Sequence, residues 1–158
     1  MRMVTEKLDG TDVWLYHGQI YIPNTYSAGA VGSKFLTTLR DKAQILGMRC
    51  PMCNRVYVPA RSVCKDCFAQ LKEWVKVSDR GTVLTYTIDH ESKPVIKPAE
   101  PPIIYAIIQL DGADTGFAHM LGQVEPEHLS IGMRVQAVFK PRAERVASIL
   151  DIKYFKPI

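Results

Sequence analysis

Four cysteines in the middle of the chain have the spacing of a metal site. They form two pairs, Cys50-Pro-Met-Cys53 and Cys64-Lys-Asp-Cys67, which ten residues separate. Four thiolates match the tetrahedral coordination of Zn²⁺, and each C-x-x-C turn can present two sulfurs to one ion. Because the protein supplies all four ligands, no position is left for water or substrate. The sequence therefore predicts a structural zinc ion.

The compartment and the neighbouring sequence favour a metal over other uses of the four thiols. The sequence starts with charged residues and lacks the apolar stretch of a secretory signal, so we expect a cytoplasmic chain. In that compartment, disulfides are rare and paired cysteines indicate metal binding. A redox dithiol is the alternative, and the lack of a βαβ pattern around the two pairs argues against it.

Short apolar runs flank the two pairs and predict the strands of a rubredoxin-like zinc ribbon. Residues 56–58 follow the first pair and end at Pro59, and residues 71–77 follow the second pair. A module of this size has too little apolar core to fold unaided, so metal binding should contribute much of its folding free energy. We assign the ribbon to residues 46–80.

The region before the ribbon, residues 1–45, predicts a hairpin and a helix. Residues 13–22 favour a hairpin with its turn at His17-Gly18. Ser33 can cap a helix over residues 33–45, and Gly47 can end it. Its apolar stripe consists of Phe35, Leu36, Leu39, Ala43 and Leu46. Such a stripe must be buried against this chain or a partner, so we expect this region to dock a partner.

Residues 81–158 predict a five-stranded β-barrel. The expected strands cover residues 82–90, 102–111, 116–124, 134–141 and 146–155. Closure into a barrel removes exposed strand edges, and a helical turn over residues 125–132 suits the oligonucleotide/oligosaccharide-binding (OB) fold. An SH3-like barrel is the alternative. The overall fold class is thus mainly β, with an N-terminal helix, a zinc ribbon and a C-terminal OB barrel.

Composition and charge narrow the possible partners. No run of about 18 apolar residues is present, so no membrane span is predicted. Residues 34–80 carry 10 basic and 4 acidic groups, while residues 81–158 carry 8 basic and 9 acidic groups. The basic ribbon would attract an anion, and Arg49, Arg55 and Arg61 are candidate phosphate ligands.

Other basic side chains lie around the predicted barrel, and no catalytic group stands out. Lys93 and Lys97 fall in a Pro-rich loop, residues 91–101, and three more cations precede the last strand: Lys140, Arg142 and Arg145. The sequence shows no nucleophile with an evident activator, so we expect no catalytic residues. Single-stranded nucleic acid is an alternative ligand, but the barrel aromatics are not interleaved with Lys or Arg.

The combined pattern resembles a known family. A helix is followed by ILGMRCPMCNRVYVPARSVC and then by W-x-x-V-x-x-x-G-T-V-L-T-Y-T. This arrangement, over roughly residues 30–157, is similar to the acyl-CoA-associated zinc-ribbon/OB-fold proteins that accompany thiolases and related condensing enzymes. Asn54 stands where many relatives have Gly, which is a minor departure because Asn also tolerates a left-handed backbone.

The resemblance implies a non-catalytic subunit of a thiolase-type acyltransferase complex. Such a subunit docks the catalytic subunit and helps to bind CoA or acyl-CoA, for which the ribbon arginines would supply phosphate contacts. One relative of this kind is the small subunit of benzoylsuccinyl-CoA thiolase, and the N-terminal extension makes that thiolysis a candidate reaction here. The alternative remains a single-stranded nucleic-acid-binding protein.

Overall fold

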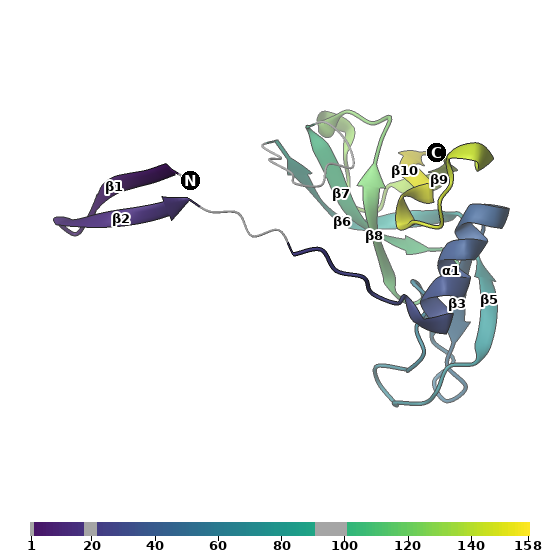
Figure 1. Ribbon diagram of the computed structural model, residues 1–158. Helices are drawn as coiled ribbons and strands as arrows, with labels where there is room; N and C mark the ends of the chain where they lie inside the picture. Colours follow the sequence, from purple (N-terminus) through teal and green to yellow (C-terminus); the bar gives the residue numbers. More distant parts are fainter. Residues whose placement is uncertain (1, 18–21, 91–100) are drawn as a thin grey trace.

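The computed structural model describes residues 2–17, 22–90 and 101–158 (Figure 1). The described elements are mainly strands with one α-helix, as predicted. They form a two-stranded hairpin, a three-stranded ribbon sheet and a closed five-stranded barrel. No helix in these ranges is long and apolar enough to cross a membrane.

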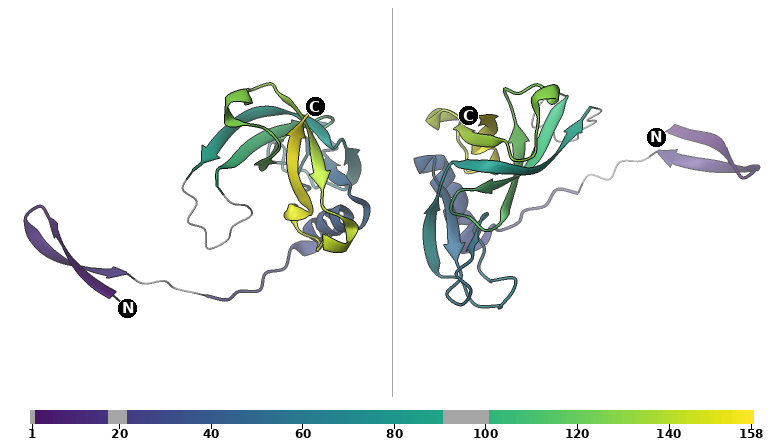
Figure 2. Two further views of the ribbon diagram at one scale, coloured as in Figure 1. Left: turned by 90° about the horizontal axis from the view of Figure 1, so that it is seen from above. Right: turned by 180° about the vertical axis from the view of Figure 1, so that it is seen from behind.

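The barrel confirms the predicted OB-type architecture. Its strands, in chain order, are β6 (Arg80–Asp89), β7 (Ile103–Leu110), β8 (Gly116–Leu121), β9 (Arg134–Phe139) and β10 (Ile152–Pro157). They are arranged β10-β8-β7-β6-β9, and the antiparallel pairing of β9 with β10 closes the ring (Figure 2). A short 3₁₀ helix, η1 (Pro126–His128), joins β8 to β9 as expected.

The last barrel strand is shorter than the sequence suggested. We predicted a strand over residues 146–155, but β10 begins only at Ile152. Before it lie two 3₁₀ helices, η2 (Arg142–Glu144) and η3 (Ile149–Asp151). Ser148 and Asp151 form a capping box around η3, which competes locally with strand pairing.

The helix exists but begins and ends earlier than predicted. α1 spans Gly29–Lys42, so Ser33 lies inside it and is not its cap. It ends where Ala43 adopts a left-handed backbone (φ 49°), and Gly47 does not end it. Two residues of the predicted stripe, Phe35 and Leu39, are buried in the chain's own core.

Gly47 belongs to the central strand of the ribbon sheet. This sheet has the order β4-β3-β5, with β3 (Ile45–Arg49), β4 (Val56–Tyr57) and β5 (Glu73–Val77). A Cβ at Gly47 would lie 2.9 Å from Cγ1 of Val56 and 3.0 Å from the carbonyl oxygen of Tyr57. The glycine therefore permits the close approach of two strands, a role that the helix prediction overlooked.

The N-terminal hairpin lies elsewhere in the sequence than expected. β1 (Arg2–Leu8) pairs with β2 (Thr11–His17) across Asp9-Gly10, where both residues have positive φ. Asp-Gly is a strong signal for such a two-residue turn, so the hairpin predicted over residues 13–22 was wrong. Part of that prediction, residues 18–21, lies outside the described residues.

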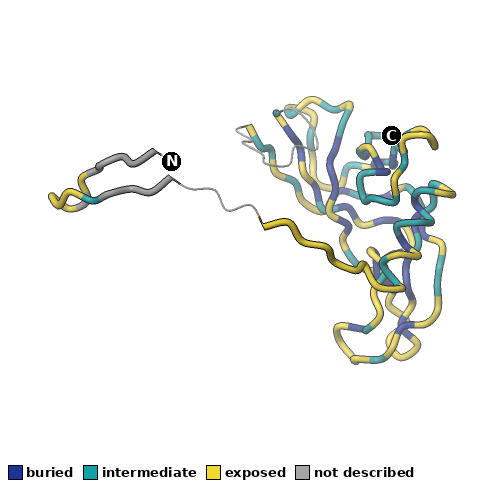
Figure 3. The backbone as a smooth tube through the Cα atoms, in the orientation of Figure 1, coloured by how far each residue is buried: buried dark blue, intermediate teal, exposed yellow. Residues whose placement is uncertain are grey.

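One apolar core joins the ribbon sheet, the helix and the barrel. It contains Phe35 and Leu39 of α1, Ile45 and Val77 of the sheet, and Ile108 of the barrel. A second, smaller cluster surrounds the cysteines and consists of Met48, Cys50, Tyr57, Cys64 and Leu71. Figure 3 shows buried backbone running through both regions. The strand end of the ribbon thus shares the barrel core, while the cysteine end has its own.

Hydrogen bonds also fasten β4 to the loop between β7 and β8. The Val56 N–H donates to Oδ2 of Asp114 at 2.8 Å, and the Asp114 N–H returns a bond to the Val56 carbonyl at 2.9 Å. The Thr115 hydroxyl bonds both main-chain groups of Val58 at 2.9 Å. These paired contacts fix the ribbon against the barrel.

Candidate metal centre

The four cysteine sulfurs converge at one point of the ribbon. All four lie within 4.8 Å of one another. The Sγ atoms of Cys50 and Cys67 are 3.3 Å apart, and that of Cys64 lies 3.7 Å from Cys53 and 3.2 Å from Cys67. A tetrahedron with Zn–S bonds of about 2.3 Å has edges of about 3.8 Å. Donor type, number and spacing therefore fit one zinc ion.

Two turns of the same geometry present the sulfurs. The Cys50 N–H donates to the Arg55 carbonyl at 2.8 Å, and the Cys64 N–H donates to the Ala69 carbonyl at 2.9 Å. The residue after each C-x-x-C has a left-handed backbone, with φ 58° at Asn54 and 55° at Phe68. The expectation for Asn54 is confirmed, while the same conformation at Phe68 had no clear sequence signal.

A buried tyrosine adjusts the chemistry of one sulfur. The Tyr57 hydroxyl lies 3.1 Å from Sγ of Cys64 and 3.3 Å from Oδ2 of Asp66. Its hydrogen bond, together with main-chain hydrogen bonds from Cys67 and Asp66, lowers the pKa of the Cys64 thiol to about 5. The same bond and burial raise the pKa of the Tyr57 hydroxyl to about 12. Cys64 is thus a thiolate at neutral pH, which is the form that binds metal.

The pKa values of two other thiols, Cys67 and Cys53, are raised, so these two ionise less readily in the absence of a cation. Hydrogen bonds to Cys64 and Cys50, together with burial, raise the pKa of Cys67 to about 12. A main-chain hydrogen bond from Arg55 lowers the pKa of Cys53, but burial and hydrogen bonds with Cys50 and Cys64 raise it, and the net shift is upward. A divalent cation reverses this balance by deprotonating its thiol ligands. All four cysteines can therefore act as thiolate ligands together only when a metal ion is bound.

The three ribbon arginines each have a local partner. Arg49 pairs with Glu73, with 3.5 Å between Nε and Oε1. Arg55 forms an ion pair with Asp66, and the Arg61 guanidinium lies 5.4 Å from the centroid of the Tyr57 ring. Arg55 and Arg61 thus both lie near Tyr57, while Arg49 is held separately on β3. Their predicted contact with CoA phosphates stays a prediction.

Two of the cations predicted near the barrel hold the helix instead. The Arg145 Nη1 donates to the carbonyl of Leu39 at 3.2 Å, and the Arg142 Nη1 donates to the carbonyl of Asp41. Both carbonyls lie in the last turn of α1, whose partial negative charge favours cations. These arginines are helix caps supplied by the barrel. Lys93 and Lys97 lie outside the described residues.

A structural role for Asp151 was not predicted from the sequence. This residue holds the segment next to the two arginines that cap α1. Its carboxylate is fully buried and accepts hydrogen bonds from the N–H groups of Val146 (2.9 Å), Ala147 (2.9 Å) and Ser148 (3.2 Å). The available signal was the Ser148-x-x-Asp151 pattern of a capping box. Asp151 therefore holds the segment that carries the helix-capping arginines.

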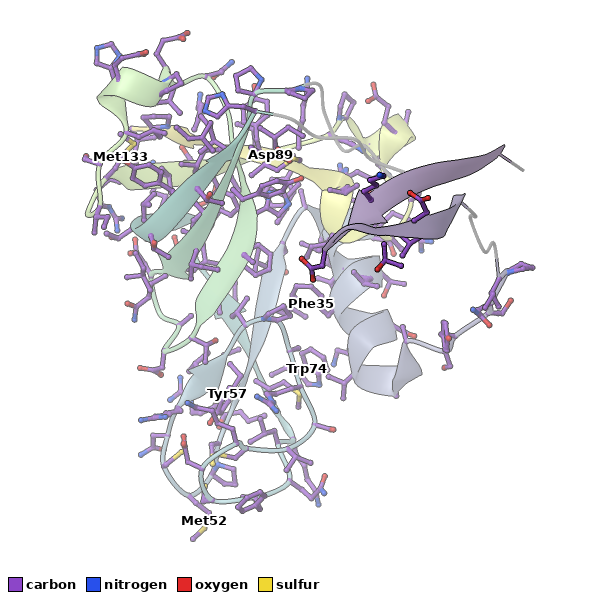
Figure 4. The ribbon with its side chains drawn as sticks, turned by 90° about the vertical axis from the view of Figure 1, so that its left-hand side faces the viewer. Phe35, Met52, Tyr57, Trp74, Asp89 and Met133 are labelled. Atoms are coloured by element: carbon purple, nitrogen blue, oxygen red, sulfur yellow. The ribbon has the colours of Figure 1, made fainter. Side chains whose placement is uncertain are left out.

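The aromatic side chains divide between core and exposed tip. Figure 4 shows Tyr57 within the ribbon, Trp74 beside α1 and Met52 at the far end. Tyr57 is buried, and Lys34 Nζ lies 4.4 Å from the Trp74 ring centroid. Met52 and Phe68, one in each cysteine turn, are 73% and 78% exposed. The ribbon end thus presents two apolar side chains to solvent.

Two known families match this chain, one over the zinc ribbon and one over most of the barrel. Residues 41–73 match the family described as the ChsH2 rubredoxin-like zinc ribbon domain. Residues 74–140 match the family described as the ChsH2 C-terminal OB-fold domain.

Curated relatives cover most of the chain. A DUF35 domain-containing scaffold protein of Methanocaldococcus jannaschii is 34% identical over 126 residues, which is 76% of this chain and 86% of the relative. One of the same description from Methanothermobacter thermautotrophicus is 28% identical over 123 residues, covering 74% of this chain and 89% of the relative.

Two solved structures share the fold. The structure described as Ltp2-ChsH2(DUF35) aldolase aligns with a TM-score of 0.58 at 21% identity, covering 79% of this chain and 93% of that one. A Sulfolobus solfataricus DUF35 protein of unknown function aligns with a TM-score of 0.57 at 26% identity, covering 70% and 78%.

Proposed function

Because this chain belongs to the family of DUF35 domain-containing scaffold proteins, we propose that it is a non-catalytic subunit of a thiolase-type acyltransferase complex. In this role it docks the catalytic subunit and helps to hold CoA or an acyl-CoA. Thiolysis of benzoylsuccinyl-CoA is one candidate reaction of such a complex. The predicted cytoplasmic location suits an acyl-CoA enzyme.

The closed four-sulfur centre is the observation that carries this proposal. Catalytic zinc sites keep a position for water or substrate, whereas four protein thiolates fill the coordination shell. The Cys50 and Cys64 sulfurs belong to buried residues, and the ribbon sheet above them is continuous with the barrel core. A metal in this setting stabilises a surface and does not react. A scaffold needs such a rigid surface.

Two exposed parts of the chain are candidates for docking the catalytic subunit. Residues 22–28 are exposed throughout and lead from the hairpin to α1, with Ile22 67% and Tyr26 84% exposed. The ribbon tip adds Met52 and Phe68. The apolar stripe of α1 packs into the chain's own core, so the docking role of residues 1–45 falls to the part before the helix. A two-stranded hairpin is marginally stable alone, which favours its packing on a partner.

The partner class rests on the family resemblance and on one relative's name. The name Ltp2-ChsH2(DUF35) aldolase joins a DUF35 protein to a second protein in an enzyme of carbon–carbon bond chemistry. Thiolases also make or break such bonds, and the sequence pattern is similar to their accessory subunits. CoA phosphates would be attracted by the basic ribbon, where Arg49, Arg55 and Arg61 can exchange local partners for phosphate oxygens.

Co-expression with a thiolase-type catalytic subunit tests the proposal. We expect one complex of fixed stoichiometry in size-exclusion chromatography, and calorimetry should show CoA binding to it. A variant that lacks residues 1–28 should keep its zinc and barrel but lose the complex. Separate elution of the two full-length proteins would overturn the proposal, and a complex with an aldolase alone would correct the partner class.

Single-stranded nucleic acid remains the second candidate, and the barrel gives it little support. OB-fold nucleic-acid sites use exposed aromatic platforms beside basic grooves. Phe117 and Phe155 are buried, and Tyr105 is only 37% exposed. In a competition assay, nanomolar binding of an oligothymidylate that millimolar CoA does not displace would favour this candidate.

A further inference from the structure

The two cysteine turns at the ribbon tip each expose one large apolar side chain. Met52 lies in the first turn and is 73% exposed, and Phe68 follows the second C-x-x-C and is 78% exposed. The main-chain bond from Cys64 to Ala69 (2.9 Å) encloses Phe68, and the Met52 N–H donates to Sγ of Cys50 at 3.4 Å. Figure 4 places Met52 at the end of the ribbon that is far from α1. The turns that present the sulfurs therefore also fix the backbone that carries these two side chains.

The backbone at Phe68 is unfavourable for a phenylalanine. Its φ of 55° lies in the left-handed region, where the Cβ of most residues crowds the following carbonyl oxygen. The matching position in the first turn has φ 58° and is occupied by Asn54, a residue type that tolerates this conformation. Because the Phe68 side chain is mostly in solvent, packing does not compensate for the backbone. A strained residue that adds little to the fold is typical of a functional position.

Charged neighbours of these side chains are engaged within the ribbon. Arg55 forms an ion pair with Asp66, and Nζ of Lys65 lies 3.9 Å from Oδ1 of the same carboxylate. An exposed aromatic ring beside such paired charges suits insertion into an apolar pocket of another protein. In protein interfaces, aromatic anchors of this kind carry much of the binding free energy.

The exposed area at the tip limits which protein can cover it. Phe68 and Met52 together can bury on the order of 300 Å², whereas a stable interface buries about 800 Å² on each protein. A dimer of this chain held through the tip alone would therefore be unstable. A larger partner that also covers the exposed residues 22–28 would supply the missing area, and the catalytic subunit of the proposed complex is such a partner.

We propose that Phe68 is an anchor of this interface and that its ring inserts into an apolar pocket of the catalytic subunit, with Met52 of the other turn as a second contact. This role rests on the proposed function and names the side chain that fixes the complex. The fold and the complex then favour different residues at this position. Asparagine should suit the turn at least as well as phenylalanine, as Asn54 does in the first turn, but it should fail as an anchor.

Calorimetric titration of the full-length, zinc-loaded chain with the purified thiolase-type subunit tests this role. We expect Phe68→Asn to raise the Kd of the complex at least about tenfold, as loss of an aromatic anchor predicts. Phe68→Leu keeps an apolar side chain and should retain most of the affinity. Ile131→Asn is the matched control, because it removes an apolar side chain that is 69% exposed on the barrel, and it should leave the Kd unchanged.

Zinc affinity, measured by competition with a chelator, is the second readout. For Phe68→Asn it should equal or exceed that of the unmodified chain, and a lower value would show that Phe68 serves the fold and would overturn the proposal. An unchanged Kd for Phe68→Asn would overturn the anchor role and leave the proposed function standing. Failure of the unmodified chain to bind the subunit would overturn both.

Other occupants of the tip give different results in the same set of variants. Sedimentation would reveal a dimer of the unmodified chain that Phe68→Asn dissociates, and flotation would reveal binding to phosphatidylserine vesicles that the variant loses. Either result would assign the tip to a second copy or to a membrane and would contradict the proposal. We expect a monomer that does not float with the vesicles.

Discussion

The Tyr57 hydroxyl lies 3.1 Å from Sγ of Cys64, inside the smaller of the two apolar clusters. This contact connects the fold to the metal centre, because Tyr57 belongs to β4, which the barrel loop fastens through its neighbours Val56 and Val58. Partners of metal ligands orient the ligands and adjust their basicity. Tyr57 therefore connects the barrel to a ligand of the metal centre.

Replacement of Tyr57 by Phe should weaken zinc binding without unfolding the chain. The ring remains in the core, but Cys64 loses the hydrogen bond that lowers its pKa to about 5. Loss of such a partner typically reduces metal affinity about 10- to 100-fold. Competition with a colorimetric zinc chelator measures this change. Tyr26→Phe, at an exposed site, is the control and should leave affinity unaltered.

Replacement of Cys64 by Ser should unfold the cysteine turns and spare the barrel. The strand end of the ribbon shares the barrel core, whereas the turns depend on the smaller cluster and the metal. Hydrogen exchange should show lost protection of the amides that bond Arg55 and Ala69 across the two turns. Protection in β6–β10 should persist. Chelation of zinc from the unmodified chain should give the same pattern, and global unfolding in either experiment would contradict this division.

The sequence predicted the elements whose signals are local and missed those set by tertiary contacts. Ligand spacing identified the metal site, and runs rich in β-branched and aromatic residues identified the five barrel strands. Gly47 was misassigned because the need for glycine arises from Val56 and Tyr57, nine and ten residues later. The arginine caps on α1 were missed for the same reason, since more than 100 residues separate Arg145 from Leu39. Contact between distant segments has no local pattern.

Replacement of Asp151 by Ala should destabilise the chain by about 2–4 kcal/mol. Three main-chain N–H groups would lose a charged acceptor that lies in the interior, and each unpaired donor costs free energy. Chemical denaturation measures the change. Glu144→Ala, an exposed change in the preceding turn, serves as the control. A loss no greater than that of the control would show that Asp151 does not hold this segment.

Stability should fall in mildly acidic solution because of His119. Its pKa in the folded chain is lowered by burial, so the unfolded chain takes up a proton first as the pH falls. The free energy of unfolding should be constant above about pH 7 and decline below about pH 6.5, by at most about 1.4 kcal/mol per pH unit. His119→Phe should remove this decline.

A second decline in the free energy of unfolding should occur at lower pH, and its cause is the protonation of Asp111. Arg134 lowers the pKa of Asp111, so its ion pair stabilises the folded chain above the ordinary carboxylate pKa and is lost below about pH 4. Urea denaturation at several pH values separates the two ranges. If the His119→Phe variant retains the decline between pH 5 and 6.5, the assignment to His119 is wrong.

The structural role of zinc requires that a metal ion hold the four cysteines together. Native mass spectrometry of the chain purified from cells, without added metal, answers this. We predict one zinc ion per folded chain, which the Cys64→Ser variant does not retain. A folded chain of metal-free mass that still assembles with its catalytic partner would contradict a structural role for zinc.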